Sequence, residues 1–422
     1  MSSVSSVGDP LLRGRDEASR LLQGDPRTSR TGMVHGRNGG RIECSSQKRK
    51  PEGRNGGGVS AMVVSAAQHL PTPAARSRFI LGLQAQLQGA LLRVLRPGTR
   101  CALIDVALHS NVGDSAILLG QLAFLRKYRM PLVYVSNFRG FSQDVLARRI
   151  GKGTILFSGG GSLGDVWPEH WAIRKQVLEA FPHNPIVQLP ESIHFRSPEA
   201  LDRAGQTMRG HPNYTLFVRD QRSLGISRND LGVNRTFLCP DMAFALGELS
   251  RSGAPDCQVL ILSRIDREKR NGYDFREVRG VMEVADWLKE CPPRLMRVNR
   301  ALTHRINTNP ELSSVLSRPV QWTYGPIARA RLRRGCRLLS RGQVVITDRL
   351  HGHIMSVLMG IPHVVLDNSY GKIRSFYDTW TSRCGFALWA DSQAQAIAVA
   401  EQLANRLPPS NSSASFLKRP RS

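Results

Sequence analysis

Short apolar runs alternate with amphipathic stretches through the middle of the chain. The stretches between the runs repeat apolar residues at helical spacing, notably in 114–128 and 167–181. Alternation of this kind is typical of a parallel sheet with helices on both faces. The strands predicted in this first half are 101–108, 132–135, 154–157, 185–189, 214–218 and 236–238.

A second alternating set follows a polar break at 247–256. Its predicted strands are 258–263, 295–298, 343–347 and 363–366, and its predicted helices are 280–290, 326–340, 352–359 and 393–406. We therefore expect an α/β fold made of two Rossmann-like, doubly wound domains, 76–250 and 256–407, that face each other across a cleft.

The two ends of the chain have a different composition. Residues 1–75 are rich in Ser, Gly, Arg and Pro, and we expect them to be a disordered basic extension. Apolar residues at helical spacing predict a helix over 76–97. The polar tail, 408–422, is expected to be flexible.

The chain carries a formal net charge of +26, and its basic residues are spread along its whole length. This balance favours acidic partners: anionic substrates, anionic lipid surfaces or nucleic acid. The seven cysteines are odd in number and form no CxxC pair, which argues against a disulfide framework or a zinc site and for a reducing compartment. No run of 18 apolar residues predicts a spanning helix, so we expect a cytoplasmic protein.

The segment 109–115, with the sequence HSNVGDS, follows the first predicted strand and opens a helix. Its Asn111 and Asp114 are candidate site residues, because backbone N–H groups at a helix start favour an anionic ligand. The alternative is that Asp114 or Ser115 only caps the helix.

A glycine-rich segment, 158–165, contains Gly160 and Gly161 directly after another predicted strand. Consecutive glycines let a backbone approach a ligand closely, although a plain tight turn accounts for them equally well. The spacing is neither that of a Walker A loop nor that of a dinucleotide-binding GxGxxG motif.

Arg219 ends the predicted strand 214–218. A guanidinium at a strand's carboxyl end can extend a forked cation toward a carboxylate or phosphate. A surface pair between Arg219 and Asp220 is the alternative. Arg264, after strand 258–263, is a further candidate of the same kind.

The densest group of reactive side chains is 347–353, TDRLHGH, between a predicted strand and a predicted helix. Within one turn it carries an acid, the cation Arg349 and the imidazole of His351, beside the positive potential of a helix start. An imidazole exchanges protons near neutral pH, so His351 is a candidate proton donor. The alternative is a structural histidine beside a helix cap.

Lys372, in the segment 367–372, can add a further donor to a bound anion, or it is a solvated loop lysine. The remaining histidines have no metal-binding spacing and are interpreted as ordinary; they include His170, His183, His194 and His304.

Taken together, these motifs resemble the polysaccharide pyruvyl transferase family. The matching pieces occur in the family's order over roughly residues 98–385 and read HSNVGDSAI, FSGGGSLGDVW, VQLPESIHF, FVRDQRS, CPDMAF and VVITDRLHGHIMSVLMGIPHVVLDNSYGKIRSF. No single piece is specific, but the ordered set is, above all DRLHGH with the downstream YGK.

The resemblance implies a two-domain fold of the glycosyltransferase-B type, with the acceptor on the N-terminal side and the donor on the C-terminal side. It implies transfer of pyruvate from phosphoenolpyruvate to sugar hydroxyls of a polysaccharide or its lipid-linked precursor, with release of phosphate. We expect catalysis from His351 and Asp114, and substrate binding from Arg349, Leu350, Arg219, Lys372, Asn111, Gly160 and Gly161.

This chemistry requires no metal or redox cofactor, and the sequence offers no clear site for either. The nearest alternative is a nucleotide-sugar glycosyltransferase of the same fold. A nucleic-acid-binding protein is an alternative from another class, but no nucleic-acid module is recognisable. The expected partners are phosphoenolpyruvate and an oligosaccharide or lipid-linked acceptor, and the basic charge also fits peripheral contact with the anionic inner face of the plasma membrane.

Overall fold

The computed structural model describes residues 70–264, 270, 272–275, 282–288 and 294–408. The expected disorder of residues 1–69 and the expected flexibility of 409–422 lie outside these residues. All the described elements belong to one compact unit, residues 63–422.

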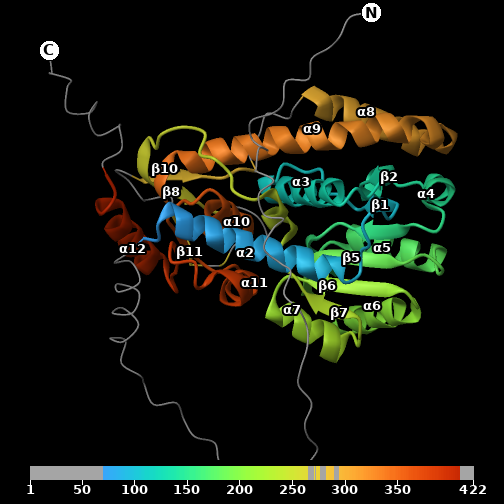
Figure 1. The fold of residues 1–422 in the computed structure, drawn as a ribbon, viewed down its shortest axis with the longest axis horizontal. Coiled ribbons are helices and arrows are strands. Elements are labelled where there is room, and N and C mark those ends of the chain that lie inside the picture. The colour runs from blue at the N-terminus through green and yellow to red at the C-terminus, as the bar shows by residue number, and fades with distance from the viewer. Residues whose placement is uncertain (1–69, 265–269, 271, 276–281, 289–293, 409–422) are drawn as a thin grey trace, which may run out of the picture. The chain divides into compact units, whose positions relative to one another are not determined.

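Within the described residues, the first sheet has seven parallel strands (Figure 1). They are β1 (Cys101–Ile104), β2 (Leu132–Ser136), β3 (Thr154–Phe157), β4 (Gly160–Gly164), β5 (Ile186–His194), β6 (Tyr214–Val218) and β7 (Thr236–Leu238). Their order is β2-β1-β3-β5-β6-β7, and β4 pairs with β5 off this path. All six strands predicted in this half are confirmed, and the glycine-rich segment adds β4, which the sequence did not predict.

Two strands differ in length from the prediction. β1 ends at Ile104 rather than at residue 108, because Asp105 takes a left-handed backbone conformation, with a φ of 64°, and turns the chain. β5 continues to His194 instead of ending at residue 189. Its pairing with β6 shifts register between Gln188 and Glu191. This span contains Pro190, which has no N–H to donate to the neighbouring strand.

Helices fill the connections of the first sheet. They are α3 (Val112–Lys127), α4 (Gln143–Ile150), α5 (Pro168–Ala180), α6 (Pro198–Gly210) and the short η3 (Phe138–Gly140), α7 (Gln221–Gly225), η4 (Ile226–Asp230) and η5 (Met242–Leu246). The predicted helices 114–128 and 167–181 are confirmed as α3 and α5. Both faces of the sheet are buried, since Leu103 belongs to one apolar cluster while Ala102 and Ile104 belong to another.

The second sheet is also parallel and has, within the described residues, the order β12-β11-β10-β8-β9. Its strands are β8 (Cys257–Leu262), β9 (Met282–Ala285), β10 (Gly342–Thr347), β11 (His363–Val365) and β12 (Ala387–Trp389). The helices that accompany them are α10 (Leu350–Leu358), α11 (Lys372–Phe376), η7 (Tyr377–Thr381) and α12 (Gln393–Asn405). The predicted strands at 258–263, 343–347 and 363–366 and the helices at 352–359 and 393–406 are confirmed.

Two predictions for the second half are wrong. Residues 282–285, predicted within helix 280–290, form the edge strand β9, which pairs with β8 in parallel register. Residues 295–298, predicted as a strand, lie in α8 (Arg294–Thr308). The short apolar run misled the prediction, because the buried positions of α8 recur at helical spacing well beyond it, at Met296, Asn299, Thr303 and Ile306.

The helix predicted at 326–340 begins much earlier. The short η6 (Pro310–Leu312) leads into α9 (Ser313–Ser340), which contains Pro319 and Pro326. Proline removes a backbone hydrogen bond and usually marks a helix boundary, so the local sequence does not indicate that one helix runs through both prolines. Packing of α9 against α3, α8 and β2 stabilises the helix across both prolines.

The helix predicted at 76–97 is α2 (Pro73–Leu92), which begins three residues earlier and ends five residues earlier than predicted. Thr72 begins the helix, because its Oγ1 accepts a hydrogen bond from the N–H of Ala75 at 3.2 Å. The buried residues of α2 join an apolar cluster that includes Leu103 of the first sheet and Leu260 of the second. The division into domains 76–250 and 256–407 stays a prediction.

The order of the strands reverses once in each sheet: between β1 and β3 in the first and between β8 and β10 in the second. In open parallel sheets, ligands bind at the carboxyl ends of the strands where this reversal occurs. The predicted motifs at 109–115, 158–165 and 347–353 follow three of these four strands, and Arg264 follows the fourth.

Candidate active site

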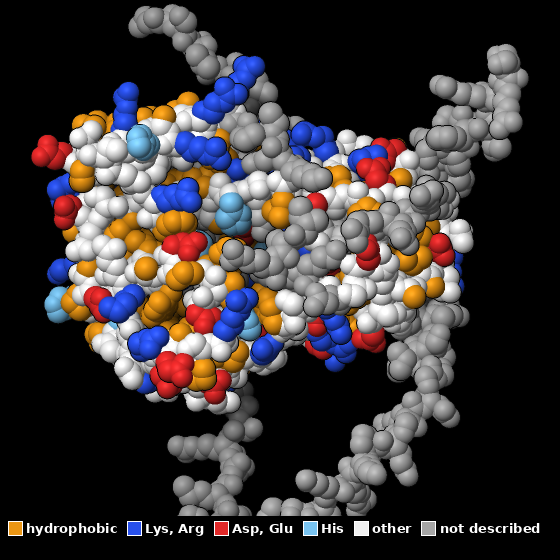
Figure 2. Space-filling model, turned by 180° about the vertical axis from the view of Figure 1, so that it is seen from behind, with side chains coloured by type: hydrophobic (Ala, Val, Ile, Leu, Met, Phe, Trp, Pro, Cys, Tyr) orange, Lys and Arg blue, Asp and Glu red, His pale blue; other side chains and the backbone are white. Residues whose placement is uncertain are grey.

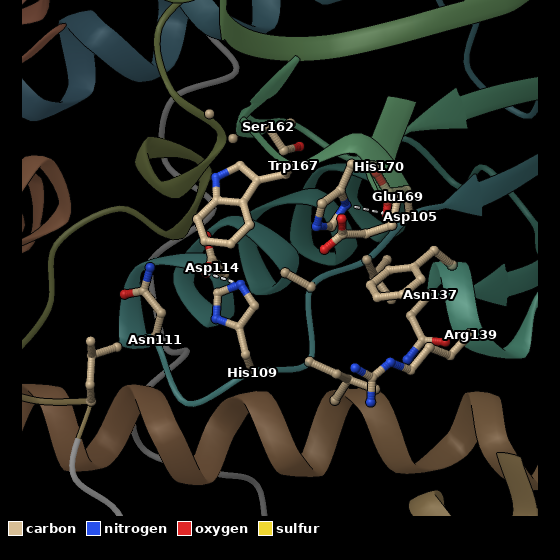
Figure 3. A pocket seen from close by; sticks show the side chains of 18 of the residues that line it. Asp105, His109, Asn111, Asp114, Asn137, Arg139, Ser162, Trp167, Glu169 and His170 are labelled. Atoms are coloured by element: carbon tan, nitrogen blue, oxygen red, sulfur yellow. Dashed lines mark hydrogen bonds and ion pairs between the residues drawn. The ribbon is translucent and has the colours of Figure 1, made fainter. Parts of the chain in front are cut away.

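A cavity of about 810 Å³ is lined by residues that follow strands of both sheets. Part of it is seen from close by in Figure 3. All nine predicted site residues line it: Asn111, Asp114, Gly160, Gly161, Arg219, Arg349, Leu350, His351 and Lys372. Arg264, the further candidate, lines it as well. Motifs that lie far apart in the sequence therefore meet around one space.

Asp241 connects the predicted proton donor to a predicted anion-binding arginine. Its Oδ2 lies 3.4 Å from Nε2 of His351 and accepts a hydrogen bond from Nη1 of Arg219 at 2.6 Å. Its Oδ1 accepts a hydrogen bond from the N–H of Ala243 at 2.8 Å, at the start of η5. The buried carboxylate of Asp241 thus contacts Arg219, which follows a strand of the first sheet, and His351, which follows a strand of the second.

Charges determine the protonation state of Asp241. Burial by itself would raise the pKa of this carboxyl, but the neighbouring His351 and Arg219 and the hydrogen bonds to the carboxylate outweigh burial and hold the pKa well below its ordinary value. Asp241 is therefore ionised at neutral pH. A fixed negative charge beside the His351 ring compensates a positive charge on that ring.

Arg219 is only 1% exposed and belongs to a buried polar network. Its Nε donates to Oγ of Ser192 at 2.9 Å, and the Ser192 hydroxyl donates to Oδ2 of Asp220 at 2.7 Å. Asp220 also caps α7 by accepting a hydrogen bond from the N–H of Ser223 at 2.8 Å. The alternative of an Arg219–Asp220 surface pair is wrong, because both side chains are buried and each has other partners.

Gly161 leaves space beside two cations. A Cβ at this position would lie 3.0 Å from Nη2 of Arg219 and 3.6 Å from Nζ of Lys372. Lys372 is buried and donates to Oη of Tyr370 at 2.9 Å, so the alternative of a solvated loop lysine is wrong. The glycine-rich segment is part of strand β4 rather than a tight turn, and its backbone faces two converging cations.

Arg349 lies at the N-cap position of α10 and is held by Asp286, the residue after β9. Its Nη2 lies 2.8 Å from each carboxylate oxygen of Asp286, and its N–H donates to Oγ1 of Thr347 at 3.1 Å. The neighbouring Asp348 accepts a hydrogen bond from the N–H of Arg264 at 2.8 Å, and burial raises the pKa of Asp348 to about 6. Two carboxylates thus flank the cation of the DRLHGH motif.

The start of α3 carries the other predicted catalytic residue. Asn111 caps the helix, because its Oδ1 accepts a hydrogen bond from the N–H of Gly113 at 3.1 Å; the alternative of a cap by Asp114 or Ser115 is wrong. Asp114 pairs instead with His109, with Nε2 and Oδ2 3.1 Å apart (Figure 3).

Gly113 brings this helix start against His351. A Cβ at position 113 would lie 2.4 Å from Cγ of the His351 ring. Only a glycine permits this approach without displacing the ring. The segment 109–115 and the segment 347–353 are therefore in direct contact, and His351 is a residue of the cavity wall.

A second histidine–carboxylate pair lines the cavity, and sequence reasoning missed it. Nδ1 of His170 lies 2.7 Å from Oδ1 of Asp105 (Figure 3), and Oδ2 of Asp105 lies 3.0 Å from Nη1 of Arg174. Asp105 is the buried residue with the left-handed backbone that ends β1. His170, interpreted as ordinary, is thus oriented by a buried carboxylate at the cavity wall.

Glu191 extends this polar network behind β4. It accepts a hydrogen bond from the N–H of Ser162 at 2.8 Å, and its Oε2 lies 3.3 Å from Nη2 of Arg174. Burial raises the pKa of Glu191 to about 7, although Arg174 and Arg219 act in the opposite direction. This carboxyl therefore exchanges its proton close to neutral pH.

The missed residues differ in what the sequence offered. Asp241 and Glu191 stand in the matched pieces CPDMAF and VQLPESIHF, and this place in a motif is the signal that could have found them. Asp241 follows β7, and Glu191 lies inside β5. No local pattern marks His170, because it lies on α5 and reaches the cavity only through the packing of that helix.

Within the part of the chain that the structure describes, no three His, Cys, Asp or Glu side chains are grouped so that they could hold a metal ion. Among the same residues, no helix is long and apolar enough to cross a membrane.

The fold and the site define a parallel α/β protein with a cavity lined by arginine, lysine and histidine. Over residues 111–370 the chain matches the polysaccharide pyruvyl transferase family. This range contains every predicted site residue except Lys372.

Three relatives are similar to this chain, and two of them are named as pyruvyl transferases. "Pyruvyl transferase 1" of Schizosaccharomyces pombe is 31% identical over 325 residues, which is 71% of this chain and 75% of that protein. "Putative pyruvyl transferase EpsO" of Bacillus subtilis is 28% identical over 302 residues, 71% of this chain and 91% of that protein. "General stress protein 30" of Bacillus subtilis is 26% identical over 299 residues, 67% and 78% of the two chains. The chain belongs to the polysaccharide pyruvyl transferase family and is a transferase.

Proposed function

We propose that the enzyme transfers pyruvate from phosphoenolpyruvate to sugar hydroxyls of a polysaccharide or its lipid-linked precursor, forming a ketal and releasing phosphate. The observation that carries this proposal is the convergence of Arg219 and Lys372 on the space beside Gly161, in the cavity that Arg349 and His351 also line. Phosphoenolpyruvate has a carboxylate and a phosphate, so its binding requires several cations in one place. Each charge-assisted hydrogen bond to it contributes about 1.5–3 kcal/mol.

In this proposal Arg219, Arg349 and Lys372 bind the donor, with the backbone of Gly160 and Gly161 and the side chain of Leu350 completing its site. The guanidinium groups are already held by Asp241 and Asp286. Side chains that are fixed before the ligand binds lose little conformational entropy on binding, which favours affinity.

The reaction balances with groups that line the cavity. His351 donates a proton to C3 of the enol, so that C3 becomes a methyl group and positive charge develops at C2. One sugar hydroxyl forms a bond to C2 and gives up its proton. The bond from C2 to the phosphate oxygen breaks, and phosphate leaves with the electron pair. The second hydroxyl then bonds to C2 and closes the ring, and its proton goes to the deprotonated His351, which restores the proton donor.

Asp241 supports the proton-donor role of His351, because an ionised carboxylate beside the ring stabilises the imidazolium that delivers the proton. A positioned general acid of this kind typically contributes about 10²–10⁴-fold to the rate.

The hydroxyl proton needs an acceptor on the other side of the donor. We assign this role to His170, because the buried Asp105 orients its ring and fixes which nitrogen carries the proton. Asp114, paired with His109, orients the attacking sugar. Trp167 and Phe138 line the same region and offer flat faces to sugar rings.

The proposal includes a glycosyltransferase-B type arrangement, in which the N-terminal half binds the acceptor and the C-terminal half supplies most of the donor site. Its support is the contribution of both sheets to one cavity. The expected place of action is the cytoplasm, where phosphoenolpyruvate is available.

The decisive experiment incubates the full chain with isotopically labelled phosphoenolpyruvate and a panel of oligosaccharide and lipid-linked acceptors. We expect an acceptor to gain the mass of a pyruvate ketal, with one phosphate released for each pyruvate transferred. Turnover of a nucleotide sugar, with no label transferred from phosphoenolpyruvate, would contradict the proposal and identify a glycosyltransferase.

A further inference from the structure

Exposed apolar side chains concentrate on one part of the surface outside the cavity. Among the described residues, eight large apolar side chains are exposed, and five of them lie on α8, η6 and α9: Leu295, Val298, Leu312, Val315 and Trp322. Val315 is 68% exposed and Trp322 is 74% exposed. Scattered exposed apolar residues are normal, but a group of them marks an interaction site. We call these five residues and the arginines among them the α8–α9 surface.

The same two helices are strongly basic. Together α8 and α9 contain ten arginines and no aspartate or glutamate, and Glu311 is the one acidic residue of the sequence between positions 294 and 340. The two helices pack against each other along one edge of the fold (Figure 1). From behind, basic side chains stand among apolar and uncharged ones along the upper edge, where Figure 1 places these two helices (Figure 2).

Helical spacing places the apolar and basic residues on one stripe of α9. Val315, Arg318 and Trp322 follow one another at intervals of three and four residues, and Arg329 and Arg333 continue the same stripe. On α8, the exposed Leu295 and Val298 stand next to the exposed Arg294 and Arg297 in the same way.

Other arginines of α9 have structural partners and do not belong to this surface. Arg331 donates to the carbonyl oxygen of Leu108 at 2.9 Å. Arg334 donates to the carbonyl oxygens of Ser110 at 2.9 Å and Trp287 at 2.6 Å. These contacts hold the segment before α3 and the segment after β9 next to the cavity.

We propose that the α8–α9 surface docks on an anionic lipid bilayer. Its apolar side chains enter the boundary between headgroups and acyl chains, while its arginines contact lipid phosphates. Tryptophan and arginine suit this boundary because each combines an apolar body with a polar or charged end. Each basic residue near an anionic leaflet adds about a fivefold gain in binding, from roughly 1 kcal/mol.

Two other occupants fit the surface less well. A nucleic acid would contact the arginines, but it would leave Val315 and Trp322 without a matching partner. A second copy of the chain in a symmetric contact would bring two arginine-rich surfaces together, each with Glu311 as its one acidic residue, and like charges repel.

Docking in this way has a consequence for the cavity. The inner side of α8 lines it through Met296, Asn299 and Thr303, while the outer side carries Leu295 and Val298. Only the width of one helix, about 10 Å, separates the two. A bilayer on the outer side would therefore lie close to the cavity. The docking itself does not depend on which substrate the cavity binds.

The test is co-sedimentation of the full chain with vesicles of phosphatidylcholine alone and of phosphatidylcholine mixed with phosphatidylglycerol. We expect binding to the anionic vesicles, little binding to the neutral ones, and weaker binding at high salt. The Val315→Ser/Trp322→Ser variant should reduce binding about tenfold or more, because it removes two apolar groups from the lipid boundary. The Arg318→Gln/Arg329→Gln variant should reduce it by a similar factor, about fivefold for each charge.

The matched control is Arg78→Gln/Leu81→Ser on α2, which removes one exposed arginine and one exposed apolar side chain away from the surface. This variant should bind vesicles as the wild type does. An equal loss in the control, or unchanged binding after Val315→Ser/Trp322→Ser, would overturn the proposal. Two further results would overturn it. One is a protein that does not bind vesicles but binds duplex DNA, and loses that binding in the Arg318→Gln/Arg329→Gln variant. The other is a dimer that dissociates in the Val315→Ser/Trp322→Ser variant.

Discussion

The cavity has two walls that hold their polar groups in different ways. The buried wall consists of Arg219, Arg349, His351 and Lys372, all nearly inaccessible, and three of these four face a buried carboxylate at 2.6–3.4 Å. The open wall consists of His109, Phe138, Arg139, Trp167 and Arg300, all of them partly or largely exposed.

This contrast shows two solutions to binding within one site. Buried charges that are paired in advance fix the position and protonation state of each group, which suits a small donor of constant structure. Exposed aromatic and basic side chains keep their rotamer freedom, which suits acceptors that vary. Changes in the buried wall should therefore reduce the rate or donor binding strongly, and changes in the open wall should alter acceptor binding modestly.

The largest expected effect comes from His351→Ala. Removal of the proposed proton donor should lower kcat by about 10²–10⁴-fold, as for other general acids. The measurement is phosphate release from phosphoenolpyruvate with a saturating acceptor. His304→Ala, which changes an exposed histidine that lines the same cavity, is the matched control and should keep most of its activity. Wild-type turnover by the His351 variant would remove this residue from the mechanism.

Asp241→Asn should have the next largest effect. The change preserves size but removes the charge that faces His351 and Arg219, so we expect kcat to fall about 100-fold, because an interaction with a charged group contributes about 1.5–3 kcal/mol. The alkaline limb of the pH–rate profile, where a proton donor loses its proton, should also move, which a purely structural defect would not cause. An unchanged pH profile, with activity lost only in proportion to unfolded protein, would argue for structural support alone.

Acid should lower the free energy of unfolding of the protein, because two histidines are buried in its core. His353 and His363 are fully buried and lie 2.7 Å apart, Nδ1 to Nε2. Burial lowers the pKa of His363 to about 4 and that of His353 well below its ordinary value. The unfolded chain binds these protons near pH 6.5 and the folded chain does not, so stability is complete above pH 6.5 and falls as the pH drops toward 4.

The expected loss is about 1.4 kcal/mol per pH unit for each histidine, or about 3 kcal/mol for His363 at pH 4. Urea unfolding between pH 7 and pH 4.5 measures it. His363→Gln should make the free energy of unfolding depend less on pH, because it removes one of the two groups. The exposed His304→Gln should leave this dependence unchanged. Parallel curves for wild type and His363→Gln would refute this origin of acid sensitivity.

Gly161→Ala tests whether the buried wall binds the donor rather than the acceptor. The added Cβ would press on Arg219 at 3.0 Å and occupy the space next to Lys372, so we expect the KM for the donor to rise about tenfold while the KM for the acceptor changes little. Gly89→Ala on α2 meets no atom within 4 Å and should behave as the wild type. A selective rise in the acceptor KM would assign this space to the sugar instead.

Trp167→Ala should have the smallest effect. This side chain of the open wall is 36% exposed, and loss of one sugar-stacking face should raise the KM for the acceptor only a few-fold, with kcat and the donor KM preserved. Trp322→Ala, an exposed tryptophan outside the cavity, is the control and should not change either KM for soluble substrates. A strong fall in kcat after Trp167→Ala would mean that the open wall is as rigid as the buried one.

Predictions from the sequence were most successful where a local pattern reports burial. Strands such as β3 and β6 were placed at their observed bounds, because a run of apolar residues between polar segments is a local property. The prediction was wrong at β9 and at the start of α8, where short apolar runs flanked by arginine fit a strand or a helix equally well. Which of the two formed depended on the neighbouring strand β8 and on the packing of α8 against α9.

The same distinction applies to the site. The sequence by itself determined the parallel α/β pattern and the placing of Arg219, Arg349 and His351 at the ends of strands, because the order of residues along the chain fixes both. Only the tertiary structure decided that Asp241 and Asp286 would hold these cations and that His170 would reach the cavity. The physical reason is that an ion pair depends on which strand ends and helix faces lie next to each other, and residues far apart in sequence meet only when the two sheets share one core.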